Sequence, residues 1–106
     1  MSDLNFQNFS SVQNKLQPMP GSIVSATTIA PTTFLTYITD SVQIATITPP
    51  VTGTHLLMFV HTDAAPATYL TTGNILTAVV PTKDVPTCFV YDPAKAKYYG
   101  YANNVT

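Results

Sequence analysis

The pattern of hydrophobic and polar positions changes at about residue 20 of the chain. Residues 1–20 carry isolated apolar side chains among Asn, Gln and Ser, and the spacing from Phe6 through Phe9 and Val12 to Leu16 is that of a short amphipathic helix. Asn-rich segments of this length are marginal helices on their own. Two interpretations stay open: a mobile terminus, or an arm that becomes ordered when its apolar side chains dock on a neighbouring protein.

From residue 21 onward, short runs of strand-forming residues follow one another at intervals of about 8 to 15 residues. Residues typical of turns, above all Pro, Gly and Asp, separate the runs. This pattern predicts an all-β domain over residues 21–106, a small antiparallel β-sandwich or barrel of about seven strands, after an extended N-terminal arm over residues 1–20. The expected strands are 22–29, 33–39, 42–48, 54–61, 75–80, 86–91 and 97–102.

The run from Leu56 to Val60 is apolar at every position. Because successive side chains of a strand point to opposite sides, a strand with one face in water alternates polar and apolar residues. A sheet packed on one other sheet in so small a domain has only one covered face. The run therefore predicts that a second subunit covers the other face, as in an oligomer interface.

Charge is scarce in this sequence. Charged residues make up 8% of the chain, against about 25% in an average soluble protein. Arg and Glu are absent, and threonine is abundant in their place. A net charge of −1 without basic clusters argues against nucleic acid or an anionic membrane surface as a partner. A surface so poor in charge predicts a chain that other subunits partly cover.

No membrane or export signal is evident. Apolar runs stay well short of the roughly 20 residues of a membrane span, and the first residues lack the basic and apolar regions of a signal peptide. We therefore expect a protein that is made and used without Sec-type export.

The residue types that carry chemistry are few and scattered. His55 and His61 lie six residues apart on one expected strand, about 20 Å from each other, so they cannot share a metal ion within one chain. His61 and Asp63 lack the third protein ligand that a zinc site requires. One histidine from each of three subunits converging on an ion stays open, beside a solvated or hydrogen-bonded histidine. Cys88 lies in an apolar run and is expected to act as a small hydrophobe.

Acid–base pairs are also missing from the pattern. The five aspartates fall singly, mostly at turns, where Asp is common for local hydrogen bonding. Neither a nucleophile elbow nor a phosphate-binding loop is present. We expect no enzyme activity, no catalytic residue, no metal site and no cofactor.

Four tyrosines form an aromatic cluster at the C-terminal end, around a turn that Asp92 and Pro93 begin. Tyrosine combines a large apolar area with a hydroxyl group. Three roles stay open for the cluster: cross-strand packing, anchoring of a protein interface, and stacking on a sugar ring. Its members are Tyr91, Tyr98, Tyr99 and Tyr101.

Residues 41–101 resemble a module of virion proteins from tailed bacteriophages and prophages. The segments that carry the resemblance are SVQIATITPP, LLMFVHTD, TTGNILTA and CFVYDPAKAKYYGY. In that module a strand ending in I-T-P-P precedes a hydrophobic strand, a G-N-I segment and a final V-Y-D hairpin that ends in Trp or Tyr. Here Tyr98 stands where Trp is expected. The likeness covers about the C-terminal three-fifths of the chain, and residues before 41 add nothing to it.

Proteins with such modules are typically trimeric β-structures on capsids or fibres, and a chain of this length resembles the decoration or cement proteins that brace neighbouring capsomers. The resemblance implies a homotrimer with the major capsid protein as partner, on the capsid surface of the virion after synthesis in the host cytoplasm. The alternative is a fibre or spike module that binds a host receptor or glycan. The expected capsid-docking residues are Phe6, Phe9 and Leu16, and the expected oligomer-interface residues are Leu57, Phe59, Tyr99 and Tyr101.

Overall fold

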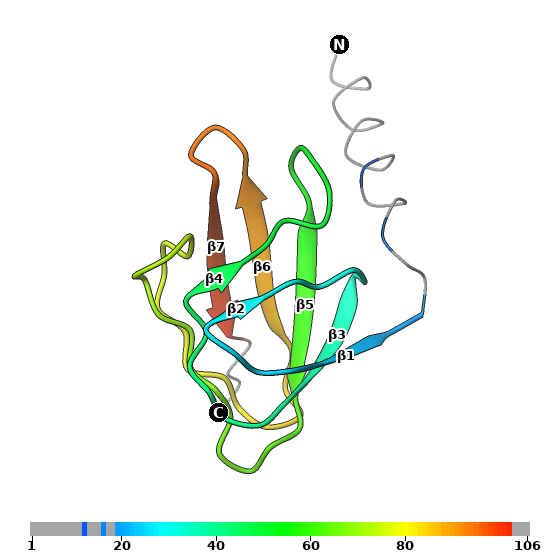
Figure 1. The fold of residues 1–106 in the computed structure, drawn as a ribbon, viewed down its shortest axis with the longest axis vertical. Coiled ribbons are helices and arrows are strands. Elements are labelled where there is room, and N and C mark those ends of the chain that lie inside the picture. Colours follow the sequence, from blue (N-terminus) through cyan, green and yellow to red (C-terminus); the bar gives the residue numbers. More distant parts are fainter. Residues whose placement is uncertain (1–11, 13–15, 17–18, 103–106) are drawn as a thin grey trace.

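The computed structural model describes residues 19–102, together with Val12 and Leu16. Residues 19–102 fold into an all-β domain without a helix, which confirms the predicted all-β character (Figure 1). The expected number of strands is confirmed as well. The strands are β1 (Gly21–Val24), β2 (Thr28–Ile29), β3 (Leu35–Thr39), β4 (Thr46–Ile47), β5 (Leu56–His61), β6 (Thr87–Asp92) and β7 (Lys97–Ala102).

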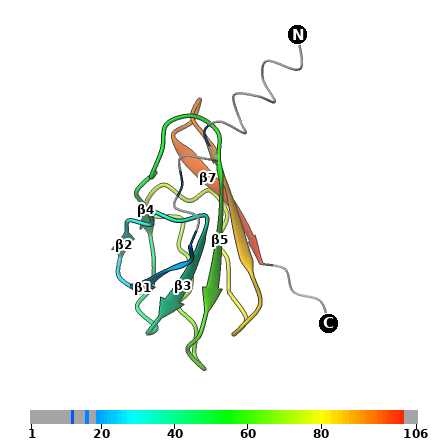
Figure 2. The ribbon, with the colours of Figure 1, turned by 90° about the vertical axis from the view of Figure 1, so that its right-hand side faces the viewer.

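The domain has two layers. One is a five-stranded sheet in the order β1-β3-β5-β6-β7, and the other contains the short sheet β2-β4. Figure 2 shows β2 and β4 on one side of the five-stranded sheet only. Bridges from Ile44 to Tyr69 and from Tyr69 to Val79 extend this second layer. We call the sheet face toward the second layer the inner face and the opposite one the outer face.

The five-stranded sheet is mixed, which corrects the expectation of an antiparallel domain. β1 pairs with β3 and β3 with β5 in parallel, whereas β5, β6 and β7 are antiparallel neighbours. Parallel neighbours need a crossover connection, because a short hairpin joins only antiparallel strands. Here the crossovers carry β2 and β4, which pair with each other in the second layer. The sheet is open, so the barrel alternative is wrong.

Three of the expected strands differ in the structure. The run 22–29 splits into β1 and β2 because the chain leaves the sheet after Val24 and bends at Thr27. The run 42–48 is reduced to the two residues of β4, and the run 75–80 is not a strand, although Ile75 and Val79 each form a single bridge to a neighbouring segment. Pairing between segments far apart in the chain decides these cases, and a local apolar pattern does not contain that information.

The core lies between the inner face and the second layer. In β5 the side chains of Leu57, Phe59 and His61 point inward and are at most 1% exposed. Phe59 packs against Tyr69 and Phe89, with ring centroids 6.1 and 5.6 Å apart. Burying each such ring contributes about 1.5–3 kcal/mol, so this aromatic cluster holds the layers together.

Gly100 gives Phe89 its place in the core. The two residues pair across β6 and β7, and a Cβ atom at position 100 would overlap the Phe89 ring. The ring is fully buried and contacts Tyr69 and Tyr98, so it has no free space to enter. Only glycine leaves room for it.

We therefore expect Gly100→Ala to lower the free energy of unfolding by about 1–3 kcal/mol through overpacking. Urea unfolding followed by circular dichroism measures the change. Gly21→Ala is the comparison variant, because a Cβ atom there approaches the Thr33 side chain at 3.0 Å and does not overlap an aromatic ring. Wild-type stability of Gly100→Ala would show that Phe89 does not need a glycine opposite it.

Candidate functional site

The outer face of the five-stranded sheet is the candidate functional site. The strand registers place ten apolar side chains on it, in rows that run across neighbouring strands. Two of these rows are Leu56–Val90–Tyr99 and Met58–Cys88–Tyr101. The full set is Val24, Leu35, Tyr37, Leu56, Met58, Val60, Cys88, Val90, Tyr99 and Tyr101.

Much of this apolar surface is open to solvent. Val24 and Tyr101 are 63% and 65% exposed, and Tyr37, Val90 and Tyr99 are each about 40% exposed. The side chains of β5 between them are partly buried by their neighbours. The second layer does not cover this face, so the apolar pattern of β5 does expose one hydrophobic side (Figure 2).

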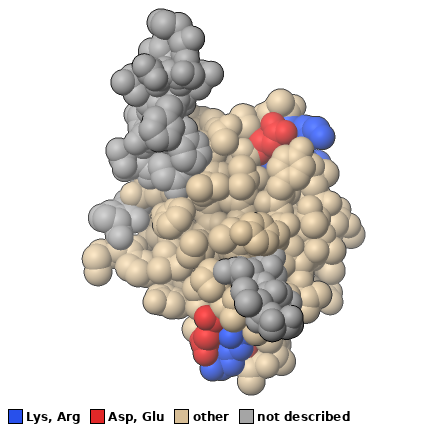
Figure 3. Space-filling model, turned by 180° about the vertical axis from the view of Figure 1, so that it is seen from behind, with Lys and Arg blue, Asp and Glu red and all other residues tan. Residues whose placement is uncertain are grey.

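Charged side chains stand only at the ends of this face among the described residues. Figure 3 views the molecule from the outer side, and among the described residues charge appears at two opposite ends, with uncharged residues between them. One end is the β6–β7 turn, where Asp92 pairs with Lys97 in the register. The other end is the turn with Lys83 and Asp84, which form an exposed ion pair of 2.8 Å. The centre offers apolar contact without charge.

Two of the predicted interface residues, Leu57 and Phe59, lie on the inner face of the sheet and not on the outer face. Leu57 and Phe59 point into the core of their own chain and are 1% and 0% exposed, so they cannot contact a second subunit while this fold is intact. The outward residues of the same strand are Leu56, Met58 and Val60. A shift of one residue reverses every side chain of a strand, and a run that is apolar throughout gives no signal for choosing between its faces.

The other two predicted interface residues lie where a partner can reach them. Tyr99 and Tyr101 are on the outer face of β7, at an edge of the sheet. Tyr91 and Tyr98, by contrast, point to the inner side, where Tyr98 is fully buried. Strand alternation thus divides the tyrosine cluster between the core and the outer face. An interface role for Tyr99 and Tyr101 stays a prediction.

The predicted docking residues of the arm fall in different regions. Phe6 and Phe9 lie outside the described residues. Leu16 is 7% exposed and belongs to the hydrophobic core of its own chain. A side chain that is already buried offers no apolar surface to a capsid protein. The predicted capsid docking therefore rests on Phe6 and Phe9 alone.

His55 is a buried, hydrogen-bonded histidine. Its Nδ1–H donates to the Gly53 carbonyl at 2.8 Å, which leaves Nε2 to accept the Tyr98 hydroxyl at 2.8 Å. Its ring stacks on Tyr91 with centroids 5.0 Å apart. Burial lowers the pKa of the imidazole. The residue links β5 to the hairpin of β6 and β7.

His61 is buried as well, with fewer partners. Its Nε2 shares a hydrogen bond of 2.7 Å with the Tyr69 hydroxyl, whereas its Nδ1 has no partner among the described residues. Burial lowers the pKa of this imidazole to about 4. Both histidines are 0% exposed, so neither can meet its copies at a metal ion on a three-fold axis. The described part of the chain also holds no group of three His, Cys or Asp residues suited to a metal.

We expect the protein to lose stability as the pH falls below 6.5. The unfolded chain takes up a proton at His61 below that value, whereas the folded chain resists uptake until about pH 4. Protonation of His61 should therefore lower the free energy of unfolding by about 3 kcal/mol between pH 6.5 and about pH 4. Below about pH 4, His61 should cause no further loss of stability. Urea unfolding at several pH values measures the drop, and His61→Gln should reduce it. An unchanged slope in that variant would contradict the assignment to His61.

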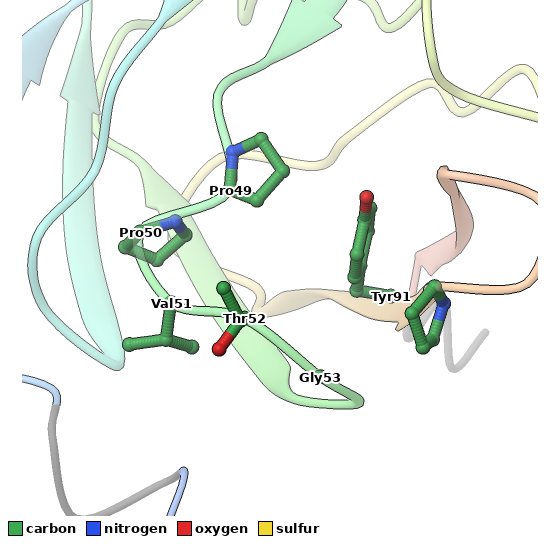
Figure 4. A pocket seen from close by; sticks show the side chains of 7 residues that line it. Pro49, Pro50, Val51, Thr52, Gly53 and Tyr91 are labelled. Atoms are coloured by element: carbon green, nitrogen blue, oxygen red, sulfur yellow. The ribbon is translucent and has the colours of Figure 1, made fainter.

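A surface pocket of about 470 Å³ lies at one end of the domain (Figure 4). Its walls come from the loop between β4 and β5 and from the start of the β6–β7 turn. Proline rings and one tyrosine provide the apolar part of its lining, beside a substantial polar part. The lining residues are Pro49, Pro50, Val51, Thr52, Gly53, Tyr91 and Pro93.

Comparisons with known proteins leave the chain without an assigned family. No protein-family model, no curated protein and no solved structure matches it. Among the described residues, no helix has the length and apolar character needed to cross a membrane. The outer face and the pocket are thus the features from which a function is argued.

Proposed function

We propose that this chain is a structural protein that binds the outer surface of a bacteriophage capsid as a trimer and stabilises the junctions between capsomers. The observation that carries the proposal is the uncharged, apolar outer face of the five-stranded sheet. The likeness of residues 41–101 to virion modules supplies the phage setting. The major capsid protein is then the partner, and the capsid surface is the location.

The size of the outer face supports a role in assembly. The five strands hold four to six residues each, which at about 3.3 Å per residue and about 4.8 Å between strands gives a plane of roughly 430 Å². The largest apolar patch of a typical soluble monomer measures about 300–600 Å² and is often a functional surface. A face of this size and composition favours contact with protein over contact with a charged ligand.

Stapling is the physical mechanism of the proposed function. Pressure inside a filled capsid pulls capsomers apart, and a protein bound across their junction adds binding free energy that separation must overcome. Many copies act on one shell, so a modest affinity per copy is sufficient. This role requires a rigid domain and a separate docking element, which the β domain and residues 1–20 would provide.

Co-sedimentation with capsids tests the proposed function. The chain is co-expressed with the major capsid protein encoded in the same phage or prophage, and shells are separated on a gradient. We expect wild-type chain to sediment with the shells to saturation. Phe6→Ala combined with Phe9→Ala should weaken shell binding at least tenfold while the solution mass of the isolated chain stays unchanged.

Two results would contradict the proposal. One is wild-type chain that stays in the supernatant at any excess over shells. The other is shells whose thermal disruption temperature is the same with and without bound chain, because a capsid stabiliser must raise it.

The pocket favours one alternative, a fibre or spike module that binds a host glycan. Proline and tyrosine rings present flat apolar surfaces, on which sugar rings stack, and Thr52 adds a hydroxyl at the rim. In this alternative the pocket holds the ligand and the outer face packs within the fibre.

A glycan array probed with the isolated chain tests this alternative. Binding should be lost in Tyr91→Ala and retained in Tyr37→Ala, which removes an exposed tyrosine remote from the pocket lining. Thermal melting confirms that both variants are folded, since Tyr91 also stacks on His55. An array without hits would leave capsid decoration as the function to pursue.

A further inference from the structure

We infer that the outer face is covered by a second copy of this chain, with Met58, Cys88 and Val90 at the centre of the contact. This inference rests on the proposed function and names the surface through which its subunits associate. The predicted interface residues Leu57 and Phe59 lie in the core, so the outward residues of the central strands take their place in the interface.

The middle of the sheet provides the apolar centre that an interface needs. β5 is the third of five strands, and its outward side chains continue into those of β6 in the pairs Leu56–Val90 and Met58–Cys88. A protein interface typically has an apolar centre, in which aromatic side chains are enriched, and a more polar rim. Here Tyr37 lies on one side of the centre, and Tyr99 and Tyr101 lie on the other.

The sheet supplies about half of the area of a stable association. A standard interface buries about 800 Å² on each partner. The plane of the five strands accounts for roughly 430 Å² of that, and pleating and projecting side chains add to the accessible area. Covering only β1 or only β7 would leave most of this surface in water, so the partner must span the sheet.

Charge favours a copy of the same chain as that partner. Among the described residues the centre of the face carries no charge, so a neighbouring copy in the trimer can pack on it without desolvating an ion. Each end of the face carries both signs, Asp92 with Lys97 at one and Lys83 with Asp84 at the other. Any end-to-end arrangement of two copies can therefore place opposite charges together at the rim.

A lysine placed at the centre of the face tests the inference. Val90→Lys puts a charge on a side chain that is 38% exposed in the single chain, so the fold can keep the new ammonium group in water. An interface that covers it must bury or displace that charge. We expect the wild-type chain to have a solution mass of three times 11.4 kDa by light scattering and the variant to have 11.4 kDa. The variant should associate with a dissociation constant at least about a hundredfold higher than that of the wild type.

Val80→Lys is the matched control. It is the same substitution at a valine that is 69% exposed outside the five-stranded sheet. Its mass should equal that of wild type. Should Val90→Lys fail to fold, Tyr101→Lys takes its place, at a position that is 65% exposed on the same face.

The Cys88 thiol gives a second readout without any substitution. It is partly exposed on the outer face of the single chain. We expect its reaction with a thiol reagent to slow as protein concentration rises, because association covers the centre of the face. A rate that is independent of concentration, with a mass that stays at 11.4 kDa, overturns the inference. So does an oligomer that Val90→Lys and Tyr101→Lys leave intact.

The outcomes separate this inference from the proposed function. If Val90→Lys abolishes self-association but the wild-type chain never sediments with shells, the interface is upheld and capsid decoration is overturned. Shell binding by a chain that stays monomeric in solution and on the shell upholds decoration and overturns the interface.

Discussion

The packing of the inner face of β5 against the second layer is the interaction on which the rest of the structure depends. Phe59 lies at its centre and contacts Tyr69 from the second layer and Phe89 from the neighbouring strand. These rings fix which side of β5 points inward. Since strand side chains alternate, the same contact also fixes Leu56, Met58 and Val60 on the outside. One core contact therefore determines the composition of the exposed face.

The two crossovers explain why that face stays open. Each parallel connection, from β1 to β3 and from β3 to β5, passes through the second layer on the inner side. The chain is too short to cover both sides of a five-stranded sheet, since a domain of this size supports a single core. Within residues 19–102, the segments that cover this sheet lie on its inner side. The outer face of the described domain can therefore contact other proteins without disturbing the core.

Buried polar pairs give the inner side its specificity. His55 with Tyr98 and His61 with Tyr69 join β5 to β7 and to the second layer through hydrogen bonds of 2.8 and 2.7 Å. An unpaired buried imidazole or hydroxyl costs about 1–3 kcal/mol, so alternative arrangements of the layers are disfavoured. The same burial keeps both histidines neutral and excludes them from surface chemistry. Their role is structural, and function is left to the outer face and the pocket.

The sequence by itself determined that the chain is an all-β domain after residue 20, because β-branched runs and proline-rich turns act locally. It also determined that the 56–60 run has apolar surface on two sides. Only the tertiary structure decided which side is the core, because a fully apolar strand has no polar position to mark its wet face. Parallel pairing of β1, β3 and β5 and the pocket beside Tyr91 likewise depend on contacts between segments far apart in the chain, which no local pattern contains.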